Sequence, residues 1–156
     1  MSTVSVGVPA PEFRLPSIRG TVFSLFEQHG GSNLVLFFLD HASGSADTLA
    51  ATSFRDACEF LAAERTAVVG IGTADLEDLR AFQEVLGLPF ELLSDDGSVS
   101  EEYGVRVRRK FGPLSRDRFR RSTFLLDRTG VIRQIFRDVN LSEHINEVLV
   151  SLDTDL

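Results

Sequence analysis

Cys58 is the only cysteine in the chain of 156 residues, and its thiol is the first candidate for nucleophilic or redox chemistry. One thiol excludes an intramolecular disulfide, a multi-thiolate metal site and a two-cysteine catalytic cycle within one chain. Cys58 shares an apolar stripe with Phe54 and Leu61 at helical spacing, which is typical of an inert core thiol. A reactive or redox-sensing thiol would need exposure and a nearby cation, so both interpretations stay open at this point.

A second candidate is an arginine-rich segment in the last third of the chain. Residues 106–121 carry a net charge of +7, which leaves −14 on the rest of a chain whose net charge is −7. The segment is interpreted as a solvated loop whose arginines pair with the protein's own acids, or as a surface for an acidic partner or, near Arg121, a small anionic ligand. The acidic remainder disfavours nucleic acid as a partner. The charged residues of the segment are Arg106, Arg108, Arg109, Lys110, Arg116, Asp117, Arg118, Arg120 and Arg121.

Other patterns that indicate metals, cofactors or membranes are weak. His29, His41 and His144 lack the spacing of metal ligands, so no metal is expected. No glycine-rich phosphate-binding fingerprint predicts a cofactor. The longest apolar run, Leu34–Leu39, has six residues, whereas a membrane span needs about 20, so no membrane partner is expected. The N-terminus lacks a basic stretch followed by an apolar one, which predicts a cytoplasmic protein.

Hydrophobic periodicity predicts strands that alternate with helices along the chain. The predicted strands are Phe13–Leu15, Val22–Leu25, Leu34–Leu39, Ala67–Gly72, Ser122–Asp127 and Val131–Phe136. The predicted helices are about Ala46–Glu64, Asp75–Leu86, Ser98–Tyr103 and Ser142–Leu152. This order indicates an α/β domain over residues 1–156, with a central mixed β-sheet, helices on both faces and an N-terminal β-hairpin. That is the thioredoxin architecture.

Four stretches in this order resemble the alkyl hydroperoxide reductase / thiol-specific antioxidant (AhpC/TSA) family, nearest its bacterioferritin-comigratory-protein type of peroxiredoxin. The similarity covers about residues 6–152 and implies the thioredoxin-like fold. Family members are thiol peroxidases, antioxidant oxidoreductases that occur as monomers and dimers. The four stretches are residues 7–15 (GVPAPEFRL), 34–39 (LVLFFL), 88–95 (LPFELLSD) with Tyr103-Gly-Val, and 121–130 (RSTFLLDRTG).

The family motif places a proline, then a threonine or serine four residues on, then the peroxidatic cysteine three residues beyond, in the first turn of a helix. The resemblance aligns Asp40 with the proline, Gly44 with the threonine and Asp47 with the cysteine, and both flanks agree without a gap. The resolving cysteine of many members falls on Thr52. The pocket arginine of the family is retained as Arg121.

Peroxide cannot oxidise an Asp to a sulfenate-like species. We therefore expect a member of the family without peroxidase activity and with a binding or interaction role; the alternative is a thiol peroxidase or redox sensor that uses Cys58. Asp47 does preserve a negative charge at a helix N-terminus facing Arg121. The two side chains either form an ion pair that closes the pocket, or Asp47 only caps the helix while Arg121 points into solvent.

Overall fold

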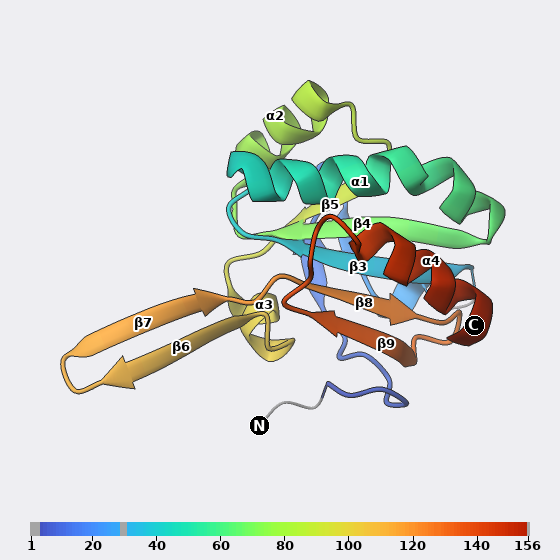
Figure 1. Ribbon diagram of the computed structural model, residues 1–156. Coiled ribbons are helices and arrows are strands. Elements are labelled where there is room, and N and C mark those ends of the chain that lie inside the picture. The colour runs from blue at the N-terminus through green and yellow to red at the C-terminus, as the bar shows by residue number, and fades with distance from the viewer. Residues whose placement is uncertain (1–3, 29–30, 156) are drawn as a thin grey trace.

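Five strands form the central sheet of the computed structural model, which describes residues 4–28 and 31–155 (Figure 1). Three strands run parallel to one another, and two further strands continue the sheet in the antiparallel sense. The predicted central mixed sheet is therefore confirmed. In spatial order the strands are β5 (Glu91–Ser94), β4 (Thr66–Gly72), β3 (Asn33–Leu39), β8 (Ser122–Leu126) and β9 (Ile132–Arg137).

Helices cover both faces of this sheet, as predicted, and the N-terminal β-hairpin is present as well (Figure 1). The buried apolar residues form two cores, one on each face of the sheet. The first core contains buried residues of the N-terminal hairpin and of α3, and the second contains those of α1, α2 and α4. The elements of the first side are β1 (Arg14–Pro16), β2 (Val22–Ser24), the short 3-10 helix η1 (Phe26–Gln28) and α3 (Ser98–Glu102). Those of the second are α1 (Gly44–Ala63), α2 (Leu76–Leu86) and α4 (His144–Asp155).

Strand β3 is central because its side chains are apolar toward both layers. Leu36 and Phe38 belong to the core on the hairpin side, whereas Val35 and Phe37 belong to the core under the helices. A continuous apolar run is what a strand buried on both faces requires. Among the described residues, no helix has the length and apolar character needed to cross a bilayer.

The arginine-rich segment is a β-hairpin, which corrects the predicted loop. Strands β6 (Arg106–Phe111) and β7 (Leu114–Phe119) pair in antiparallel register and project from the body of the molecule (Figure 1). Gly112 adopts a positive φ of 58° at the tip, a conformation that glycine tolerates without strain. Hydrophobic alternation could not reveal these strands because charged residues fill most of their positions.

The structure differs from the predicted elements at two further places. Strand β5 was not predicted, because four residues after a Leu-Pro-Phe turn give too little periodicity to separate a strand from a loop. Helix α1 begins at Gly44, two residues before the predicted start. By contrast, helix α2 begins after Asp75, which caps it, and ends as predicted at Gly87, whose φ is 62°.

We expect Gly70→Ala to destabilise the fold, because the side chains of Phe37 on β3 and Leu92 on β5 occupy the space that a methyl group on Gly70 would need. A Cβ on Gly70 would lie 2.7 Å from Leu92 Cδ2 and 2.9 Å from Phe37 Cζ. Overpacking of this kind costs about 1–3 kcal/mol. Gly72→Ala is the matched control, since its nearest contact is a looser 3.3 Å to Leu79 Cδ2. Urea unfolding of the two variants measures the difference, and equal midpoints would contradict the tight packing at Gly70.

Candidate functional site

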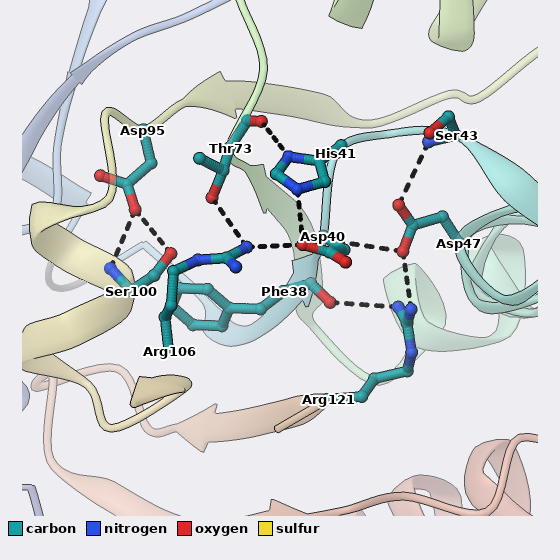
Figure 2. A network of polar contacts seen from close by, with 10 residues as sticks. All are labelled: Phe38, Asp40, His41, Ser43, Asp47, Thr73, Asp95, Ser100, Arg106 and Arg121. Carbon is teal, nitrogen blue, oxygen red and sulfur yellow. Dashed lines mark hydrogen bonds and ion pairs between the residues drawn. The ribbon is translucent and has the colours of Figure 1, made fainter. Parts of the chain in front are cut away.

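Polar side chains gather where the parallel strands β3 and β4 end (Figure 2). Asp40 and His41 follow β3, and Thr73 follows β4. Arg121 lies immediately before β8, and Arg106 begins β6. The carboxyl ends of parallel strands commonly carry binding sites in α/β sheets, because the loops that follow them converge there.

Asp47 is the most deeply buried acid of this cluster, with 1% of its surface exposed. Its Oδ1 lies 2.7 Å from Nη2 of Arg121, whose side chain is 15% exposed. Of the two alternatives left open by the sequence, the ion pair is therefore the one that forms, and Arg121 does not point into solvent. A second guanidinium nitrogen of Arg121, Nη1, donates to the carbonyl of Phe38 at 3.5 Å. The charge of this buried carboxylate is thus compensated by a directed, charge-assisted contact.

The Asp47 carboxylate also binds the loop that leads into helix α1. The backbone N–H of Asp40 donates to Oδ1 at 3.1 Å, and that of Ser43 donates to Oδ2 at 3.2 Å (Figure 2). Ser43 is the N-cap residue by backbone position, but its own side chain makes no capping hydrogen bond. Asp47 therefore contacts the helix N-terminus as well as Arg121, and the interpretation in which Arg121 points into solvent is wrong.

Gly44, which the resemblance aligned with the motif threonine, contributes backbone rather than a hydroxyl. Its φ is 84°, and Ala42 just before it has a φ of 56°. Two left-handed residues so close together bend the chain sharply between β3 and α1. The carbonyl of Gly44 accepts a hydrogen bond from Thr48 Oγ1 at 2.8 Å.

A second ion pair, between Asp40 and Arg106, was not predicted from the sequence. Arg106 Nη2 lies 2.6 Å from Asp40 Oδ1 and 3.4 Å from Thr73 Oγ1, and the arginine side chain is 9% exposed. Its buried Nε has no hydrogen-bond partner. The signal available in the sequence was an acid at the motif proline position, but its partner lies 66 residues away. No local pattern connects them.

His41 extends this second pair toward the surface. Its Nε2 lies 3.3 Å from Asp40 Oδ1, and its Nδ1 lies 3.1 Å from the carbonyl oxygen of Thr73. A cleft of about 340 Å³ opens beside these residues and is lined in part by His41, Thr73 and Arg106. Asp47 and Arg121 do not line that cleft.

Phe119, at the end of β7, connects the two ion pairs. The guanidinium carbon of Arg106 lies 5.4 Å from the centre of the Phe119 ring, and that of Arg121 lies 5.0 Å from it. Both arginines therefore make cation–π contacts with one ring. The base of the β6–β7 hairpin is in this way part of the site.

Cys58 lies away from this site, in the middle of helix α1. It follows Asp47 by eleven positions, which corresponds to about 16 Å along a helix axis. The thiol is half-buried and packs against the core on the helix side. Burial raises the pKa of the Cys58 thiol, and the negative charge of Glu59 raises it further. Less thiolate forms at neutral pH as a result, which is the opposite of an activated cysteine.

The histidines occupy separate positions. His41 lies at the site, His144 is buried at the first position of helix α4, and His29 falls outside the described residues. Across residues 4–28 and 31–155, no group of three or more His, Cys, Asp or Glu side chains could hold a metal ion. His144 Nε2 instead lies 2.8 Å from Thr123 Oγ1, and its ring packs edge-on against Phe54 and Phe136.

Comparisons with known proteins agree with this fold. The model of the AhpC/TSA family matches residues 6–135. The chain is 33% identical over 150 residues to peroxiredoxin Bcp of Escherichia coli K12, and 30% identical over 152 residues to peroxiredoxin Bcp of Bacillus subtilis 168; each match covers 96% of both chains. The crystal structure of peroxidoxin BcpB from Mycobacterium tuberculosis superposes with a TM-score of 0.83 at 28% identity, covering 95% of this chain and 96% of that one.

The fold is the thioredoxin fold in the form that peroxiredoxins share. The chain belongs to the AhpC/TSA family, with relatives of the Bcp and peroxiredoxin Q type. The activity of that family is thiol-dependent peroxide reduction.

Removal of the Asp47 carboxylate should be costly, because it leaves the largely buried Arg121 charge without its partner. Breaking a buried ion pair in this way costs about 3–5 kcal/mol. We expect Asp47→Ala to lower the free energy of unfolding by an amount in that range, measured by urea denaturation. Asp117→Asn is the matched control, because Asp117 pairs with Arg108 where both side chains are about half exposed. Exposed pairs contribute about 0–1 kcal/mol, and equal losses in the two variants would contradict the importance of the buried pair.

His144 makes folding stability pH-dependent. Burial lowers the pKa of His144 below its ordinary 6.5, against an opposing contribution from Glu147. Below pH 6.5 the imidazole of His144 binds a proton more readily in the unfolded chain than in the folded chain. The contribution of neutral His144 to the free energy of unfolding is therefore fully present above that pH, and it is lost as the pH falls toward the folded pKa. We expect His144→Gln to lose less stability than the wild type between about pH 7.5 and about pH 5.5, the range in which histidine titrates. Denaturation midpoints across that range test this; parallel curves for the two proteins would refute it.

Proposed function

We propose that this chain is a non-catalytic member of its family, in which Asp47 occupies the position of the peroxidatic cysteine and the protein acts by binding rather than by peroxide reduction. The observation that carries the proposal is the Asp47 carboxylate, which is 1% exposed and lies 2.7 Å from Arg121. Two cores around one central sheet support a single domain over the chain. The cytoplasmic location expected from the sequence is part of the same proposal.

The chemistry of peroxide reduction requires a sulfur atom. A thiolate attacks one peroxide oxygen, the O–O bond breaks, the sulfur is oxidised to sulfenic acid, and the other oxygen leaves with the electron pair and takes up a proton. The Asp47 carboxylate has no atom that can undergo this cycle. Arg121 would have to polarise the peroxide and stabilise the leaving oxygen, but it is paired with Asp47 instead.

The other motif positions support the same proposal. Asp40 is paired with Arg106, and Gly44 has no hydroxyl to donate to a peroxide. These residues hold the loop between β3 and α1 in place through charge and backbone conformation. Both arginines of the site are in this way paired with the protein's own acids.

A second candidate function is a thiol peroxidase or redox sensor that uses Cys58. The observation in its favour is that the thiol is half-buried rather than fully enclosed. Its raised pKa and the separation of about 16 Å from Asp47 along the helix oppose it. The non-catalytic function therefore has the stronger support.

Peroxide assays on three proteins test the proposal. We expect the wild type to consume hydrogen peroxide no faster than the dithiothreitol background. In the variant Asp47→Cys/Cys58→Ser, the new thiol lies at a helix N-terminus facing Arg121, an environment that lowers a thiol pKa. It should be oxidised to sulfenic acid about tenfold or more faster than Cys58 in the wild type, because thiolate is the reactive form. Dimedone trapping and mass spectrometry measure the rate.

Cys58→Ser is the control for the thiol background in these assays. Wild-type peroxide consumption that disappears in Cys58→Ser would overturn the proposal in favour of the Cys58 enzyme. A thiol at position 47 that is oxidised no faster than Cys58 would contradict the assignment of Asp47 to the peroxidatic position.

A further inference from the structure

The β6–β7 hairpin extends away from the sheet and the helices (Figure 1). Within the part from Val107 to Arg118 whose side chains the structure describes, none is buried. Six residues per strand give a ribbon about 20 Å long. A structure of this length, held only at its base, is available to a partner along its whole length.

The tip of the hairpin is apolar. Residues 111–114 are Phe-Gly-Pro-Leu, and they join the last pair of the ladder, Phe111 and Leu114. Leu114 is 71% exposed. A partner that offers an apolar environment would remove the Leu114 side chain from water, which is favourable.

Basic residues surround this tip. Residues 107–118 carry a net charge of +4, while the remainder of the chain carries −11. The register pairs Val107 with Arg118 and Arg108 with Asp117, so Arg108 and Arg118 lie on opposite faces of the ribbon. Their side chains are 57% and 68% exposed. Their contacts with Asp117 and Asp138 are exposed ion pairs, which are weak and easily exchanged.

We infer that the β6–β7 hairpin docks end-on onto an anionic phospholipid surface, with the apolar tip at the boundary between headgroups and acyl chains and the basic residues among the anionic headgroups. Apolar side chains at the boundary and cations at the headgroups are the combination that holds peripheral proteins on such surfaces. This inference extends the proposed function by naming a partner. It depends on the binding role in that proposal and not on the absence of peroxidase activity.

The charge distribution favours a lipid surface over nucleic acid. A β-ribbon that reads a nucleic-acid groove lies along the groove, which would bring the acidic body close to the phosphates. End-on docking keeps that body about 20 Å from the anionic surface, beyond the Debye length of about 8 Å at physiological salt. Basic residues on both faces also suit an end-on contact, in which headgroups surround the ribbon. The sequence predicted no membrane partner because its longest apolar run is too short to span a bilayer. A tip of four residues that docks on a lipid surface is too short to be recognised by that test.

Vesicle sedimentation tests this inference. We expect the wild type to sediment with phosphatidylcholine vesicles that contain one third phosphatidylglycerol, but not with pure phosphatidylcholine, and added salt should weaken the binding. Leu114→Asp should lower the partition coefficient about tenfold or more, because the apolar tip contribution is lost. Arg118→Gln should lower it about fivefold.

Two variants elsewhere on the surface serve as matched controls. Val85→Asp introduces the same charge at an 83% exposed apolar residue of α2, and Arg14→Gln removes a 64% exposed arginine. Both should bind as the wild type does, and circular dichroism should show that all four variants are folded. Equal binding to neutral vesicles, an equal loss in Val85→Asp and Leu114→Asp, or tighter binding to duplex DNA or polyglutamate than to vesicles would each overturn the inference. The peroxide assays are independent: vesicle binding by an active peroxidase would overturn only the proposed function, and an inactive protein that ignores vesicles would overturn only this inference.

Discussion

The need to compensate one buried negative charge organises the functional end of this protein. Asp47 is almost entirely enclosed, and an unpaired carboxylate in such a place would cost several kcal/mol. Its oxygens are satisfied by Arg121 and by the backbone N–H groups of Asp40 and Ser43. These partners come from the residue before β8, the end of β3 and the cap of α1. One carboxylate thereby joins the loop between β3 and α1 to Arg121, which lies 74 residues after Asp47 in the sequence.

On the proposed assignment, the electrostatics that activate a thiol in the family are retained here without the thiol. A helix N-terminus and an arginine stabilise any negative charge placed between them. They do so for a carboxylate as well as for a thiolate, so replacing Cys by Asp preserves the local charge while removing the reactive atom. The second pair, Asp40 with Arg106, adds a further charge-compensated contact at the same strand ends. The pocket is thus stabilised by interactions of the kind that catalysis would otherwise use.

Much of this arrangement could be predicted from the sequence. Strand β3 and helix α2 follow from the hydrophobic pattern. The register of the motifs placed Asp47 opposite Arg121 but left open whether the two side chains form an ion pair. The β6–β7 ribbon could not be predicted, because its strands are recognised by their pairing and not by apolar alternation. The link from Arg106 through Phe119 to Arg121 was hidden for a related reason: it depends on a long-range approach of side chains that no spacing along the chain encodes.

The position of Phe119 at the root of the hairpin has a geometric consequence for a distant part of the molecule. Arg106 opens the ribbon, Phe119 closes it, and both are held by the ion-pair network. Because the ribbon is about 20 Å long, a tilt of about 10° at its root would sweep its far end through about 3 Å. The ion pairs at the base of the hairpin therefore determine the orientation of the whole ribbon relative to the sheet.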